Sequence, residues 1–321
     1  MPPASSALTH SSLRSQRQPQ QQPRQLAKER WWRDLTIVLT TSPVPSNPST
    51  SVLEQVFQSF AKVPRLQEAQ KLIHLDGTNP ALPLRRRTSY AEFARRIALL
   101  ISTAADFRHT HLHQSETYLF AAHNLAAAVQ FVNTTFMLVH QHDFVIARPF
   151  DLKGLLRTMR EKSHALKHVR LNVRPNVARG FDSFVENYTE GRVPLARTCG
   201  WSDCPHVTTK EYYTRFVIPK NRADHFNGAR KFMEESLHYR MLRQGRPGGC
   251  WALQQAVARG ETHLPWPRDF DDYGTYLYGY ASARDGSYVE HRSLRGAQER
   301  WPTLQELGLK GTPRRRNRTH S

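Results

Sequence analysis

The chain has 321 residues, enough for one large domain or two small ones. Apolar residues make up 39% of it, which excludes fibrous, collagenous and wholly disordered classes. The formal net charge is +19, but the segments before Asp34 and from Lys310 onward carry +5 each. Roughly half of the excess charge therefore lies near the termini, which weakens the case for a fold that itself binds nucleic acid.

Three segments differ in composition. We expect residues 1–30 to form a disordered basic arm, residues 31–300 one domain, and residues 301–321 a basic tail. The arm contains Arg, Ser, Gln and Pro, so an organelle transit peptide is a second reading. Residues 117–142 lack charged side chains, but interspersed Asn, Gln and His predict a buried helix and strand rather than a membrane span. We therefore expect a soluble protein of the cytoplasm or an organelle, with the compartment open.

The cysteines are few and odd in number. Cys199, Cys204 and Cys250 do not make a disulfide framework, and a reducing compartment is the simpler interpretation. A zinc site built from them and His206 matches no standard structural-zinc spacing.

Strand and helix patterns alternate along the first half of the chain. Strands are predicted at residues 35–40, 71–76, 109–114, 134–140 and 168–173. Helices are predicted to start near Asn47 or at the Ser51-x-x-Glu54 pattern, and near Ser89, Glu116 and Asp151. The region from 175 to 225 predicts irregular loops, followed by a helix at about 223–243 and a turn-rich stretch. This alternation predicts an α/β protein with a mainly parallel sheet flanked by helices.

Polar residues follow the predicted strands, where open parallel sheets bind their ligands. They are Thr40 to Pro43, Asp76-Gly77, His113-Gln114 and Gln141 to Asp143. A carboxylate there could hold a divalent cation or accept hydrogen bonds from a base or ribose. The alternative is that these residues cap helices and form turns.

Residues 34–151 resemble the start of a GT-A glycosyltransferase of the family 2 type, and the likeness reaches less securely to Arg295. It rests on Leu35 to Thr50, on Ile73 to Gly77, and on a small-residue helix feeding a strand that ends at Asp143. The resemblance implies a UDP- or GDP-sugar donor, an unidentified acceptor and a divalent cation, Mn²⁺ or Mg²⁺.

The resemblance also implies roles for the residues at the strand ends. Asp76 would contact the nucleotide base, with Thr41 and Ser42 beside the nucleoside. The Asp-x-Asp motif of the family reads Gln141-His142-Asp143 here, so the final aspartate is kept and the first is replaced. Asp143 would then bind the metal and Gln141 would contact the donor.

Later segments supply candidates to complete the site. Glu234 and Glu235 lie where the family has an acidic pair that includes the catalytic base, and Asp203 is the second choice. A histidine near the end of a GT-A domain often returns to the metal, so the resemblance makes His291 a candidate metal ligand. Arg292 and Arg295 could bind phosphate. The alternative is that the acidic pair lies on an exposed helix face, and that the histidine and the two arginines lie in a solvated loop.

Aromatic and histidine side chains leave further alternatives. Trp201 could stack on a sugar ring or fill the core. His109, His111 and His113 alternate, which places them on one face of a strand, either as a metal surface or as ordinary hydrogen-bonded histidines. The chain contains no P-loop, Gly-x-Gly-x-x-Gly, Gly-x-Ser-x-Gly or His-Glu-x-x-His motif.

Two hypotheses follow. The first is a metal-assisted, inverting glycosyltransferase that uses a nucleotide-sugar donor. The second is a catalytically inactive GT-A-like scaffold that binds nucleic acid or another polyanion through its basic tails, with strongly salt-dependent affinity.

Overall fold

A computed structural model describes residues 30–178, 182, 184–224, 232–243, 250–261, 266 and 270–292. The unit considered below begins at Trp31. In the part of the chain described, no helix is long and apolar enough to cross a membrane.

The strands are β1 (Leu35–Thr41), β2 (Gln70–Leu75), β3 (Thr110–Gln114), β4 (Phe136–Gln141), β5 (Phe144–Ile146), β6 (His168–Arg170), β7 (Val185–Tyr188), β8 (Leu195–Thr198), β9 (His206–Thr209), β10 (Thr275–Tyr278) and β11 (Val289–His291). The helices are α1 (Ser51–Ser59), α2 (Leu84–Thr103), α3 (Phe120–Gln130), α4 (Leu152–Glu161), α5 (Lys210–Tyr212), α6 (Ile218–Asp224), α7 (Met233–Arg243), α8 (Cys250–Ala258) and α9 (Phe270–Tyr273).

Nine of the described strands form one sheet in the order β3-β2-β1-β4-β9-β6-β10-β8-β7. Seven of them run in one direction, while β8 and β9 run against their neighbours. Strands β5 and β11 form a separate antiparallel pair. The prediction of an α/β protein with a mainly parallel sheet is confirmed.

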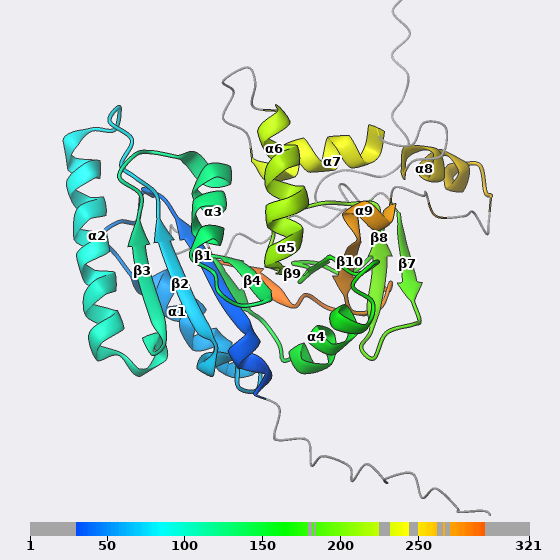
Figure 1. The fold of residues 1–321 in the computed structure, drawn as a ribbon, viewed down its shortest axis with the longest axis horizontal. Coiled ribbons are helices and arrows are strands. Elements are labelled where there is room, and N and C mark those ends of the chain that lie inside the picture. Colours follow the sequence, from blue (N-terminus) through cyan, green and yellow to red (C-terminus); the bar gives the residue numbers. More distant parts are fainter. Residues whose placement is uncertain are drawn as a thin grey trace, which may run out of the picture. The chain divides into compact units, whose positions relative to one another are not determined.

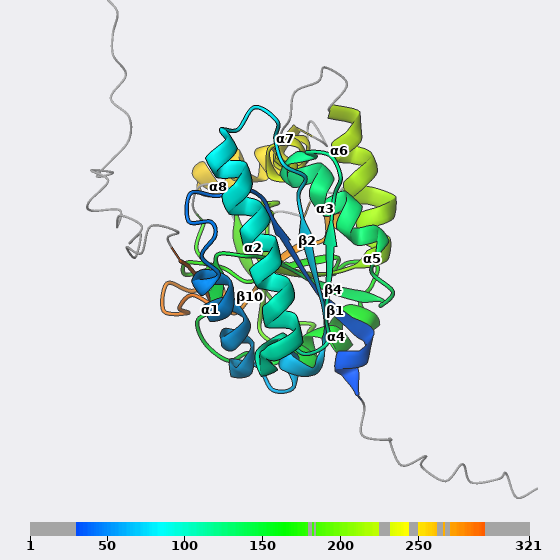
Figure 2. The same cartoon turned by 90° about the vertical axis from the view of Figure 1, so that its left-hand side faces the viewer.

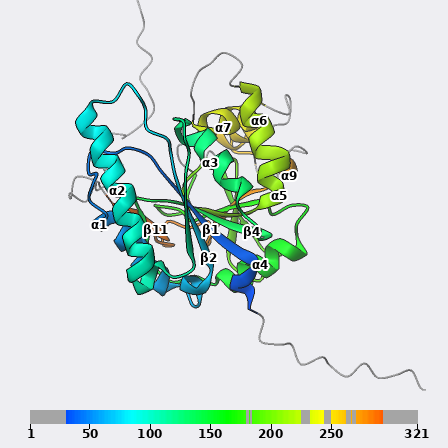
Figure 3. The same cartoon turned by 60° about the vertical axis from the view of Figure 1, so that its left-hand side comes forward.

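Helices cover both faces of the parallel part of the sheet (Figure 1). Helices α1 and α2 lie on one face and α3 on the other (Figures 2 and 3). The connections explain this arrangement: the chain steps outward from β1 to β2 and β3, then returns through α3 to β4 on the other side of β1. Right-handed crossovers that step in opposite directions place their helices on opposite faces.

The central strand shows why this sequence forms a buried sheet. Leu35, Ile37, Val38 and Leu39 are fully buried in β1, as expected for a strand covered on both faces. Strand β1 pairs in parallel with β2 and with β4. The predicted strands at residues 35–40, 71–76, 109–114, 134–140 and 168–173 are all present, with ends that differ by up to three residues.

The predicted helix starts are met in part. Of the two starts offered for α1, the later one holds: the helix begins at Ser51, and Asn47 instead accepts the Val44 N–H in the preceding turn at 2.8 Å. Helix α2 begins at Leu84, five residues before Ser89. Asp151 does cap α4, since its carboxylate accepts the Gly154 N–H at 2.8 Å.

The region predicted to be irregular contains three strands. The sequences of β7, β8 and β9 span four residues each, and β10 and β11 were likewise missed in the later turn-rich stretch. Such short strands do not show a clear period-2 pattern, so only pairing with neighbours reveals them.

The expectation of reduced cysteines was wrong for two of the three. Cys199, directly after β8, forms a disulfide with Cys250 at the start of α8, and Cys204 stays free. The pairing also rules out a zinc site that uses Cys199 and Cys250. Disulfides are typical of proteins from oxidising compartments.

Candidate functional site

A cavity of about 220 Å³ opens at the carboxyl ends of β1 and β4. It lies where the strand order reverses, because β2 and β3 continue on one side of β1 and β4 lies on the other. This is the position at which open α/β sheets bind ligands. The lining residues are Thr40, Thr41, Ser42, Ala121, Ala122, Asn124, Leu125, Val139, His140, Gln141, His142, Asp143, Asp203, Phe232 and Met233.

Five of the residues predicted from sequence line this cavity together. They are Thr41, Ser42, Gln141, Asp143 and Asp203. The amide of Gln141 donates to the backbone carbonyl of Asp203 at 3.1 Å and so ties the end of β4 to the loop before β9. The volume is below the roughly 300–1,000 Å³ of pockets that enclose a drug-sized ligand, so the cavity would enclose only part of a nucleotide-sugar.

Asp143 and His291 meet although 148 residues separate them. The imidazole Nε2 of His291 donates to Oδ2 of Asp143 at 3.0 Å, and both side chains are largely buried. The contact is positioned by the β5–β11 pair, in which His291 lies opposite Phe144. Burial acts to raise the pKa of Asp143, but the His291 hydrogen bond and the nearby His142 outweigh it, so the pKa is lowered and the carboxylate is ionised.

The separation of these two atoms fits a pair of metal ligands. Adjacent ligands about 2.1 Å from an octahedral cation lie about 3.0 Å from each other. Within the described residues, no group of three or more His, Cys, Asp or Glu side chains could hold a metal ion. A cation bound at Asp143 and His291 would therefore depend on water and on ligand oxygens for its other positions.

Asp203 and Glu234 form a second pair, whose side chains share a hydrogen bond. Asp203 lies in the loop between β8 and β9, and Glu234 lies in the first turn of α7. Burial, followed by the charge and the hydrogen bond of Glu234, raises the pKa of Asp203 to about 8. Ser202 Oγ donates to Glu234 Oε2 at 2.8 Å, which leaves the shared proton on the Asp203 side of the pair.

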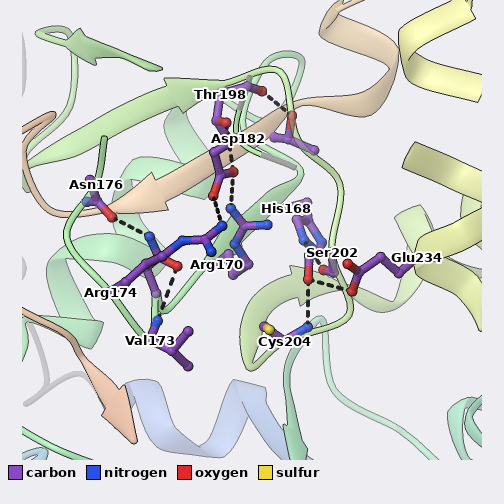
Figure 4. A network of polar contacts seen from close by, with 12 residues as sticks. His168, Arg170, Val173, Arg174, Asn176, Asp182, Thr198, Ser202, Cys204 and Glu234 are labelled. Atoms are coloured by element: carbon purple, nitrogen blue, oxygen red, sulfur yellow. Dashed lines mark hydrogen bonds and ion pairs between the residues drawn. The ribbon is translucent and has the colours of Figure 1, made fainter. Parts of the chain in front are cut away.

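A buried polar network lies behind this pair (Figure 4). Arg170 on β6 forms an ion pair with Asp182, and the Thr198 hydroxyl donates to the same carboxylate at 3.0 Å. Arg170 acts to lower the pKa of Asp203, but burial and Glu234 outweigh it. Sequence reasoning missed both residues; an arginine inside an otherwise buried strand was the available signal.

Three buried histidines near the cavity are neutral. Burial lowers the pKa of His140 to about 4 and that of His206 to about 3, and it also lowers the pKa of His168. His206 accepts from the Tyr213 hydroxyl at 2.8 Å, and His168 donates to the Ser202 carbonyl at 3.0 Å. His168 and His206 thus hold the loop that carries Asp203, whereas His140 donates to the Gln141 carbonyl at 2.9 Å.

Asp76 lies away from the cavity lining. Its carboxylate is fully buried and accepts the backbone N–H groups of Leu119 at 2.7 Å and Phe120 at 3.0 Å. Burial raises the pKa of this carboxyl, and the backbone hydrogen bonds oppose that effect. The side chain therefore caps the start of α3, the alternative that the sequence left open.

The remaining candidates occupy different positions. Glu235 is exposed and does not line the cavity, whereas Glu234 beside it is partly buried. Trp201 is fully buried, which confirms the core reading. Arg292 pairs with Glu290 at 3.2 Å and donates its backbone N–H to the Asp143 carbonyl, while Arg295 lies outside the described residues.

No protein-family model matches the chain, and no curated protein sequence matches it. Similar solved structures include TarS from S. aureus in complex with UDP-GlcNAc, at 13% identity and a TM-score of 0.35 over 56% of this chain and 46% of that one. They also include GalNAc-T7 with UDP, GalNAc and Mn²⁺, at 8% identity and a TM-score of 0.38 over 56% of this chain and 35% of that one. The chain thus spans less than half the length of these proteins, and at such TM-scores the function has to be argued from its own residues.

Proposed function

We propose that the chain is a GT-A-type glycosyltransferase that moves a sugar from a nucleotide-diphosphate donor to an acceptor hydroxyl. The observation that carries the proposal is the pairing of two different carboxyl sites at one cavity: Asp143 with His291, and Asp203 with Glu234. One site suits a cation and a diphosphate, and the other suits proton transfer.

The donor diphosphate would lie beside Asp143 and His291. A divalent cation bound there would neutralise the negative charge that grows on the diphosphate as it leaves. The backbone and hydroxyl groups of Thr41 and Ser42, at the end of β1, would face the nucleoside. Ala121 and Ala122 leave room for close approach of the ligand on the α3 side.

The Asp203–Glu234 pair would act as the base. The acceptor oxygen attacks the anomeric carbon, the bond from that carbon to the phosphate oxygen breaks, and the acceptor proton passes to the carboxyl pair. The nucleoside diphosphate leaves with the bonding electrons. A single displacement of this kind inverts the anomeric configuration.

Calorimetry of UDP and GDP, with and without Mn²⁺, tests the donor site. We expect Mn²⁺-dependent binding of one nucleotide, weakened at least tenfold in Asp143→Ala and His291→Ala. Glu290→Ala is the matched control, because this residue precedes His291 on β11 and is half exposed. The nucleotide affinity of Glu290→Ala should equal that of the wild type.

Two other outcomes would contradict the proposal in part or in full. Metal-independent binding that Asp143→Ala leaves intact would remove Asp143 as a metal ligand. A folded protein that binds no nucleotide would overturn the proposal and favour the polyanion-binding scaffold, which salt-dependent binding to the basic termini would then test.

A further inference from the structure

An aromatic ring lies at the edge of the cavity, just before α7, and packs on a second ring at the start of α3. Phe232 lines the cavity and is 47% exposed, an unusual degree of exposure for a large apolar ring. Its ring centroid lies 5.2 Å from that of Phe120, which in turn lies 6.4 Å from Tyr118 in an edge-on arrangement. An exposed aromatic ring that packs on a second, partly buried one at the edge of a cavity indicates a surface that a ligand covers.

The backbone beneath these rings is strained. Phe120 has φ of +67°, a conformation that bulky residues rarely adopt and that costs roughly 1–2 kcal/mol. Such strain persists only where the surroundings impose it, and it concentrates at functional sites.

The end of β2 supplies that constraint. The Asp76 carboxylate holds the N–H groups of Leu119 and Phe120. Gly77 lets the chain pass directly above it, because a Cβ there would come within 2.1 Å of the Thr117 backbone. The Asp76-Gly77 pair thus fixes the segment that carries the Phe120 ring.

The position of Phe232 indicates which ligand the rings meet. Phe232 precedes α7, two residues before Glu234, so the rings and the carboxyl pair belong to the same side of the cavity. A hydroxyl that gives its proton to Asp203 and Glu234 belongs to the acceptor. The group that covers Phe232 is therefore part of the acceptor, and the apolar face of a sugar ring suits stacking on an aromatic side chain.

We propose that Phe232 and Phe120 form a stacking platform for a sugar ring of the acceptor, so that the acceptor is a carbohydrate. This inference rests on the proposed function, because the carboxyl pair identifies the acceptor side. Phe232 would supply the stacking face, while Phe120 and Asp76 would position it.

Saturation-transfer NMR with methyl glycosides of glucose, galactose, mannose and N-acetylglucosamine tests the platform, with UDP or GDP and Mn²⁺ present. We expect one glycoside to receive saturation at the ring protons of one face, and Phe232→Leu to raise its Kd fivefold to tenfold. Phe232→Trp should retain binding. Phe131→Leu is the matched control, because Phe131 is 48% exposed but stacks on His113 at the other end of α3.

The outcomes separate this inference from the proposed function. Nucleotide binding together with no glycoside binding, or with equal affinity for wild type and Phe232→Leu, would overturn the platform and leave the donor site standing. Glycoside binding that depends on Phe232, without any nucleotide binding, would show that Phe232 stacks on a sugar but would overturn the transferase, and with it the assignment of that sugar to an acceptor.

Discussion

The two halves of the sheet are built differently. Strands β3, β2, β1 and β4 run parallel, and the apolar residues of β2, β1 and β4 are buried. Strands β9, β6, β10, β8 and β7 are joined by loops and short helices, and β9 and β8 reverse direction. Specific links stabilise this second half: the Arg170–Asp182 ion pair and the Cys199–Cys250 disulfide.

The candidate site lies at the seam between the halves. Strands β4 and β9 are neighbours, with Val139 opposite His206. Asp143 comes from the end of the parallel half, whereas Asp203 and Glu234 come from the second half. We therefore propose that the parallel half binds the donor and that the second half supplies the base.

Removing the base should have the largest effect. Asp203→Asn cannot accept the acceptor proton, so we expect turnover to fall by about 10²–10⁴ while nucleotide affinity stays within about twofold. Glu235→Gln, an exposed neighbour of Glu234, is the control and should keep full turnover. Loss of nucleotide affinity in Asp203→Asn would show that the two halves do not divide the work in this way.

The pH dependence sharpens the same test. Because burial and Glu234 raise the pKa of Asp203 to about 8, wild-type turnover should rise with pH through about pH 8. Glu234→Gln removes the neighbouring charge and should move this rise in turnover to lower pH.

The raised pKa of Asp203 also means that wild-type stability falls as pH rises from about 4 to about 8. Asp203→Asn should therefore gain stability relative to wild type over that range.

Breaking the Cys199–Cys250 disulfide should have the next largest effect, on stability. The bridge closes a loop of 51 residues, and losing it should lower the free energy of unfolding by about 4 kcal/mol. Denaturation of Cys199→Ser, with and without reductant, measures this loss. Cys204→Ser is the control because Cys204 is free, and reductant should still destabilise it.

An unchanged denaturation midpoint for the wild type in reductant would contradict that prediction. It would mean that packing alone stabilises the second half as it does the first. The disulfide would then not distinguish the two halves.

The two halves also differ in how far the sequence predicts them. Long apolar runs such as Leu35–Thr41 identify the parallel strands because burial on both faces requires them. Strands such as His206–Thr209 are short and buried beside polar partners, so no local pattern distinguishes them from loops. Arg170 and Asp182 neutralise each other's charge in the folded chain, and no local sequence pattern pairs them.

The site was predictable in part for the same reason. Strand ends in a parallel sheet meet at one edge, so Thr41, Ser42 and Asp143 could be placed together from sequence. The contact of Asp143 with His291 came only through the resemblance, because 148 residues separate them. Whether a strand-end aspartate faces inward or toward the cavity depends on the next segment of chain, which is why Asp76 and Asp143 looked alike.

Asp76→Ala tests whether Asp76 caps α3 or faces the ligand, and it should have the smallest effect. The variant leaves the N–H groups of Leu119 and Phe120 without their acceptor, and we expect a loss of about 2 kcal/mol in the free energy of unfolding. Asp76→Asn, which keeps one carbonyl oxygen, should lose less. Calorimetry below the melting temperature should give a nucleotide affinity close to that of the wild type, because Asp76 caps α3 and does not line the cavity. A tenfold loss of nucleotide affinity at unchanged stability would instead make Asp76 a donor ligand, as the family resemblance implies.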